Sequence, residues 1–145
     1  MKSVAKLLVV LSAVGAFACT GGEITRDGEP LEGVSVQIWT CSEKPAFETH
    51  TNEGGLYLFN PYQANSPDLD ESQRVPAGPI AFSLHDYNGG FAFHRRLHAY
   101  DEECSIPYDG STQSLPCKRH DIEFDPMGVE EYYAEVNAFL LDDCP

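Results

Sequence analysis

Three histidines in the middle of the chain are the residues whose type and spacing could bind a metal ion. His94 and His98 alternate onto one face of an extended strand, and His85 lies across the hairpin predicted before them. Imidazole nitrogens are common ligands of zinc and copper. The alternative is that all three are surface histidines beside Arg95 and Arg96. Because the spacing matches no known ligand motif, we predict no resident metal and no other cofactor.

A second group of potential ligands lies in residues 61–76, which we predict to be a flexible loop. Asp68, Asp70 and Glu71, together with Asn65, offer the oxygen atoms that calcium prefers. Their spacing lacks the glycine and the terminal glutamate of an EF-hand loop. The alternative is a solvated acidic loop.

Aromatic residues could supply a ligand platform, although core packing and turn-flanking positions explain them as well. They are Trp39, Tyr57, Tyr87 and Phe91. The chain shows no Ser/His/Asp order with a nucleophile elbow, no phosphate-binding loop and no reactive-thiol setting. We therefore predict that the protein is not an enzyme. Loops at one end of the fold, residues 61–76 and 86–90, would then carry any binding.

The elements that must position these residues are short strands separated by turns. Val34, Val36 and Ile38 alternate, which predicts a half-buried strand over residues 34–39. The Asp27-Gly28 step favours a tight hairpin before it. Weaker patterns predict further strands at residues 47–52, 56–59, 80–85, 91–100 and 119–124.

Residues 132–141 are ambiguous. Val136, Phe139 and Leu140 would share one face of a helix, but every second residue of the segment is also apolar or aromatic. We predict a strand there, because aromatic residues and valine favour strands. With about seven short strands at this spacing, residues 19–145 are predicted to form one all-β domain, an antiparallel Greek-key β-sandwich.

The first residues have the features of a secretory signal peptide, predicted over residues 1–18. Lysines precede an apolar stretch that is shorter than the roughly 20 residues of a transmembrane helix. A cysteine follows directly, so we predict a lipoprotein acylated at Cys19. Residues 16–18 also fit an ordinary A-x-A cleavage site, and free secretion is the alternative.

The chain has five cysteines. Lipidation of Cys19 would leave four, enough for two disulfides in any of three pairings. They are Cys41, Cys104, Cys117 and Cys144. Disulfides indicate an oxidising compartment, so we predict a location at the bacterial outer membrane or cell surface.

A formal net charge of −14 disfavours nucleic acid and anionic lipid headgroups as partners. Attachment to a membrane would therefore depend on the lipid anchor. The expected partners are an envelope protein or a glycan.

The stretch from Gly22 to Phe59 resembles the carboxypeptidase regulatory-like and transthyretin-like modules, whose pattern is "G-x-P-L-x-G-V-x-V" followed by "T-x-x-G-x-Y-x-F". The matching residues are Gly28, Pro30, Leu31, Gly33, Val34 and Val36, then Thr51, Gly54 or Gly55, Tyr57 and Phe59. This resemblance implies a β-sandwich and is nearly silent on function.

Secreted transthyretin-like proteins often show a late cysteine, a loop, and then Cys-x-Arg leading into a strand. Cys104 and the run Cys117-Lys118-Arg119 look similar. The resemblance thus implies a bond between Cys104 and Cys117, which leaves Cys41 to pair with Cys144.

Residues 33–39 and 51–59 also resemble the core of intradiol ring-cleavage dioxygenases. That family binds iron through two tyrosines and two histidines, the latter in a "P-A-H-I-H-F" stretch. Residues 76–82 read Pro-Ala-Gly-Pro-Ile-Ala-Phe here, so the resemblance implies that this iron site is absent. The Tyr-Arg-Gly-Ser ending of the transthyretin-like hydroxyisourate hydrolases is also missing.

We therefore predict a non-catalytic interaction or structural module. The competing hypothesis is a metal-dependent enzyme or metal carrier that uses His85, His94 and His98.

Overall fold

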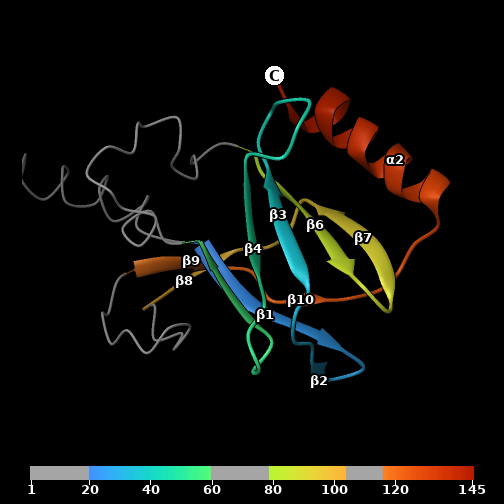
Figure 1. Cartoon of the computed structure of the whole chain (residues 1–145). Coiled ribbons are helices and arrows are strands. Elements are labelled where there is room, and N and C mark those ends of the chain that lie inside the picture. The colour runs from blue at the N-terminus through green and yellow to red at the C-terminus, as the bar shows by residue number, and fades with distance from the viewer. Residues whose placement is uncertain (1–19, 60–78, 104–115) are drawn as a thin grey trace, which may run out of the picture.

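The computed structural model describes residues 20–59, 79–103 and 116–145. These residues form two β-sheets that face each other, with one short helix beside the second sheet (Figure 1). The predicted all-β sandwich is therefore confirmed at the level of its class. The predicted signal peptide, Cys19, the loop at residues 61–76 and Cys104 lie outside the described residues.

The first sheet is built around β1 (Thr20–Arg26). Its members are β1, β2 (Glu29–Pro30), β5 (Leu56–Phe59), β8 (Tyr100–Glu103), β9 (Pro116–Arg119) and β10 (Ile122–Glu123). β2 and β5 pair antiparallel with β1, whereas β9 and β10 pair parallel with it, and β8 extends the sheet beyond β9. The prediction of an antiparallel sandwich is therefore wrong for this sheet, because the chain returns to β1 twice in the same direction. The predicted hairpin joins β1 to β2, where Asp27 and Gly28 have φ angles of 52° and 82°.

The link between β9 and β10 passes very close to β1. His120 donates its backbone N–H to the carbonyl of Gly21 at 2.8 Å. A Cβ atom on Gly22 would overlap the carbonyl oxygen of His120. Gly22 therefore permits an approach that no side chain would allow.

The second sheet has the strand order β4 (Phe47–His50), β3 (Ser35–Trp39), β6 (Ala81–Asp86) and β7 (Gly90–Arg95), and all its pairs are antiparallel. The strands predicted near these positions are confirmed. The strand predicted over residues 91–100 is shorter, because β7 ends before Arg96, whose φ of 58° turns the chain away. The described residues form ten strands, some of two residues, where about seven were predicted.

The main core lies between the two sheets. Its buried side chains are Ile24, Val34, Val36, Ile38, Tyr57, Phe59, Phe82, Leu84, Ala92, Ile122 and Phe124. Burying a side chain of this kind stabilises a fold by about 1.5–3 kcal/mol. Tyr57 satisfies its hydroxyl within the core by donating to the carbonyl of His120 at 2.6 Å. Burial raises the pKa of Tyr57 well above its ordinary value.

The strand predicted over residues 132–141 is wrong, because the chain is helical there. α2 spans Val129–Ala138 and continues into the π-helical turn η2, Phe139–Asp143. The buried positions Val136 and Phe139 follow the helical period, and Tyr132 is half-buried one turn earlier. Acidic residues in the first turn, Glu130 and Glu131, favour the helix N-terminus.

α2 lies on the outer face of the second sheet, beside β7 (Figure 1). A second buried cluster holds it there, formed by Trp39, Ala81, Phe93, Val136 and Phe139. The rings of Phe93 and Phe139 lie 6.1 Å apart. No helix among the described residues is both long and apolar enough to span a membrane.

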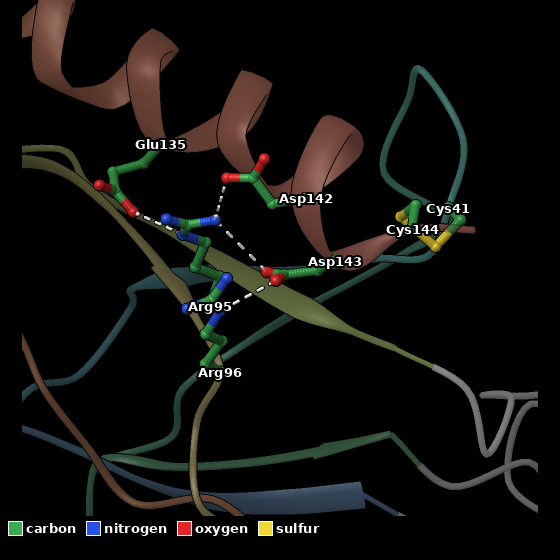
Figure 2. Close-up of polar contacts among 7 residues, drawn as sticks. All are labelled: Cys41, Arg95, Arg96, Glu135, Asp142, Asp143 and Cys144. Carbon is green, nitrogen blue, oxygen red and sulfur yellow. Dashed lines mark hydrogen bonds and ion pairs between the residues drawn. A yellow bond between two sulfur atoms is a disulfide. The ribbon is translucent and has the colours of Figure 1, made fainter.

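Ion pairs and a disulfide fix the C-terminal segment to the sheet (Figure 2). Arg95, at the end of β7, lies 3.3 Å from Glu135, 3.4 Å from Asp142 and 3.6 Å from Asp143. Arg96 pairs with Asp143 at 2.9 Å.

The predicted disulfide between Cys41 and Cys144 is confirmed, with its Cα atoms 5.5 Å apart. It joins the segment after β3 to the segment after η2. The bond between Cys117 and Cys104 stays a prediction, because Cys104 lies outside the described residues.

Candidate functional site

The register of the second sheet assigns its side chains to two faces. Directly opposite residues share a face, and successive residues alternate between faces. One outward row is His50, Ser35, His85 and Phe91, and the next is Glu48, Gln37, Ser83 and Phe93. α2 covers the β7 end of these rows and leaves Ser83 on β6 only 4% exposed. The polar side chains on β4 and β3, together with His85 on β6, are left as an open surface.

This surface is hollowed into a groove of about 460 Å³, which we call the outer-face groove. Its floor consists of Ser35, Gln37, Glu48, Ser83 and His85. Its aromatic and apolar walls come from the β6–β7 hairpin and the start of α2, with Tyr87, Phe91, Val129, Tyr132 and Tyr133. The groove is thus polar below and mainly aromatic at the sides.

Hydrogen bonds hold the floor in one arrangement. The indole Nε1 of Trp39 donates to Ser83 Oγ at 3.0 Å, and Ser83 Oγ donates to Gln37 Oε1 at 2.9 Å. Because this second bond uses the oxygen of the Gln37 amide, its nitrogen can donate to a ligand. A further hydrogen bond joins Tyr132 to Ser83, and partial burial raises the pKa of Tyr132.

Glu48 supplies the acceptor capacity of the floor. Its Oε1 accepts a hydrogen bond from Ser35 Oγ at 2.9 Å. About half of the Glu48 side chain is exposed, and the imidazole of His50 lies 3.9 Å away. An ionised carboxylate has room for several donors, so Glu48 can accept from a ligand as well.

Two tyrosines at the rim of the groove are strongly exposed. The exposed fraction is 95% for Tyr87 and 60% for Tyr133. Each has an aromatic neighbour: the ring of Tyr87 lies 6.3 Å from that of His85, and the ring of Tyr133 lies 5.5 Å from that of Tyr132. Exposed aromatic rings next to a hollow are typical of binding surfaces.

The three predicted metal-ligand candidates are not brought together. His85 lies on the groove floor, whereas His94 is opposite Phe82 and therefore faces the other side of the sheet. His98 follows the turn at Arg96 and is not on the strand at all. The described part of the chain contains no group of three metal-binding side chains.

The four predicted platform aromatics divide evenly. Trp39 and Tyr57 are buried in the two cores, whereas Tyr87 and Phe91 line the groove. The predicted binding turn, residues 86–90, contributes Tyr87. Sequence reasoning missed the polar floor, although its signal was present: the residues that alternate with Val34, Val36 and Ile38 must point outward.

A second hollow, of about 580 Å³, lies at the end of the sandwich near His120. Its charged lining residues are Arg96, Asp142 and Asp143. Arg96 pairs with Asp143, and Asp142 pairs with Arg95. His120 is only 4% exposed, and burial lowers its pKa to about 4, so the ring is neutral. With its charges paired internally, this hollow offers a ligand less than the outer-face groove does.

No family model matches the chain, and no curated protein matches it. Among solved structures, the fold is similar to the dioxygenase domain of a dioxygenase carbohydrate-binding protein fusion from the cellulolytic bacterium Streptomyces sp. SirexAA-E. The sequence identity is 16%, the match covers 75% of this chain and 79% of that chain, and the TM-score is 0.43.

Proposed function

We propose that the protein is a non-catalytic binding module of the bacterial cell envelope and that the outer-face groove is its binding surface. The observation that carries this proposal is the pair of exposed tyrosines, Tyr87 and Tyr133, above a hydrogen-bonded polar floor. A surface of this kind can bind a ligand without reorganising, because its floor belongs to a regular sheet.

The chemistry of the groove supports binding rather than catalysis. Among the residues lining it, Glu48 is the one carboxylate and His85 is the one imidazole. Gln37 and Ser35 add neutral polar groups, which suit recognition of a ligand. Ser83 is only 4% exposed and holds the Gln37 amide in place through its own hydrogen bond. We propose that the scaffold is a Greek-key sandwich of the transthyretin-like or carboxypeptidase regulatory-like type.

The amino terminus would hold this module at the membrane. Lipidation of Cys19 after cleavage of residues 1–18 attaches the chain through its acyl groups. The net charge of −14 keeps its surface away from anionic headgroups and nucleic acid. A glycan or a protein of the envelope is then the ligand within reach.

Co-sedimentation with envelope fractions of the native host tests the groove. The proteins are produced without residues 1–18 and with Cys19→Ser, so that no lipid anchor carries them to the membrane. We expect the protein with the intact groove to sediment with the envelope material and the double variant Tyr87→Ala/Tyr133→Ala to stay in solution. Leu141→Ala is the matched control, because Leu141 is 80% exposed and does not line the groove. Equal sedimentation of all three proteins would contradict the proposal.

The lipid anchor needs its own measurement, the intact mass of the protein from its native host. A chain that begins at Cys19 and carries a diacylglyceryl and an acyl group would support the anchor. An unmodified chain that begins at Cys19 would mean ordinary secretion.

A further inference from the structure

We infer that the outer-face groove binds a neutral carbohydrate chain. This inference rests on the proposed function, since it names the ligand class of that same groove. It depends on three properties of the site: the exposed aromatic rings, the mixed donors and acceptors of the floor, and the sign of the charge.

The aromatic rings match the apolar side of a sugar. A pyranose ring presents a face of C–H groups, which packs against the electron-rich face of an aromatic ring. Tyr87 and Tyr133 expose their rings at the rim, while Tyr132 is held behind them by an edge contact with Phe91, at 5.0 Å between ring centroids. Two exposed rings on different elements could contact two units of one chain.

The floor matches the hydroxyl edge of a sugar. Each hydroxyl group both donates and accepts a hydrogen bond, so a sugar site needs donors and acceptors side by side. The Gln37 amide nitrogen is a donor and the Glu48 carboxylate is an acceptor, and the two residues are directly opposite each other on β3 and β4. The exposed His85 lies diagonal to Gln37 on the other neighbouring strand, β6. These groups lie on neighbouring strands, as the register shows.

Charge and polarity disfavour the other ligand classes. Glu48 in the floor and a net charge of −14 would repel acidic sugars and phosphate. An acyl chain would cover the Gln37 amide nitrogen and the Glu48 carboxylate without offering either a hydrogen bond. A peptide that extends a sheet needs a strand edge, whereas this groove lies on a sheet face. The groove volume of about 460 Å³ falls within the range of small-ligand sites, so a short segment of the carbohydrate would occupy it.

Binding of defined oligosaccharides to the purified protein tests this inference. The probes are cellohexaose, xylohexaose, chitohexaose and maltohexaose, with hexagalacturonic acid as the acidic comparison, and isothermal titration measures affinity. We expect at least one neutral hexasaccharide to bind. Tyr87→Ala, Tyr133→Ala and Gln37→Ala should each weaken that binding by about tenfold, and Leu141→Ala should leave it unchanged.

Three results would overturn the inference: no binding of any neutral probe, binding of the acidic probe alone, or neutral binding that the three groove variants leave unchanged. Thermal unfolding of each variant, expected to match the wild type, shows that the folds are intact. If the probes fail while envelope co-sedimentation still requires Tyr87 and Tyr133, the carbohydrate class is wrong and the proposed binding surface stands. If the substitutions at Tyr87 and Tyr133 also leave co-sedimentation unchanged, both proposals fail.

Discussion

The two faces of the four-stranded sheet have opposite properties although the same strands make both. On the inner face, Val36, Ile38 and Phe82 are fully buried against the other sheet. On the outer face, the alternating residues Ser35 and Gln37 form the floor of an open groove. One set of strands thus packs the core on one side and forms the floor of a groove on the other.

The outer face is itself divided by the C-terminal segment. α2 and η2 cover its β7 side, held by the Arg95 ion pairs and the disulfide from Cys41 to Cys144 (Figure 2). The β4 and β3 side stays open, and the start of α2 becomes a wall of the groove. The segment therefore shapes the groove while it seals the second core.

The comparison predicts that changes on the inner face have the largest effect on stability. Phe82 is fully buried, with ring centroids 5.0 Å from His120 and 6.0 Å from Tyr57. Phe82→Ala should lower the free energy of unfolding by about 3–5 kcal/mol, because it leaves a cavity in the core. Urea denaturation measures the change. A loss below about 1 kcal/mol would show that this face is not the stabilising one.

Loss of the disulfide should have the second largest effect on the free energy of unfolding. It closes a loop with a sequence separation of 103, and loss of such a bond typically costs about 2–4 kcal/mol. The double variant Cys41→Ser/Cys144→Ser should therefore unfold at lower denaturant concentration. The bond anchors the far end of the helical segment whose start is a wall of the groove, so ligand affinity should fall as well. Unchanged ligand affinity in the folded variant would show that the groove wall does not depend on the disulfide.

His120 makes the inner side sensitive to acid. Its folded pKa of about 4 lies below the ordinary 6.5, so the unfolded chain binds the proton more readily. This contribution to stability is complete above pH 6.5 and is lost as the pH falls toward 4. We expect a loss of about 2 kcal/mol between pH 7 and pH 5. In His120→Leu, the free energy of unfolding should change less with pH between pH 7 and pH 5. An unchanged pH dependence would show that His120 is not the group responsible.

Changes in the groove should affect stability least. Tyr87 is almost fully exposed, so Tyr87→Ala should alter the free energy of unfolding by less than about 0.5 kcal/mol. Its effect should appear in ligand affinity alone. A destabilisation as large as that of a core variant would mean that the ring serves packing.

Strand patterns and turn chemistry made much of the sandwich predictable. Val34, Val36 and Ile38 alternate as a half-buried strand must, and the Asp27-Gly28 turn has the positive φ angles that its residues allow. The helix was mispredicted because Tyr132, Val136 and Leu140 satisfy both periods. The second buried cluster favours the helix, because Val136 and Phe139 pack there against Trp39, Ala81 and Phe93, which are distant in the sequence.

The groove was predictable only in part. The turn with Tyr87 was expected to bind, and the outward position of Gln37 follows from the strand pattern. That Glu48, His85 and Tyr133 converge depends on strand order and on where α2 docks, which no local pattern encodes. The metal hypothesis relied on an extended strand through His98, and the turn at Arg96 removes that premise.

The central claim, that the outer-face groove is the binding surface, is tested most directly by an NMR titration of the ¹⁵N-labelled protein with the best-bound neutral hexasaccharide. We expect amide shifts concentrated at Gln37, Glu48, His85, Tyr87 and Tyr133. Shifts confined to the hollow around His120 and Arg96 would contradict the claim.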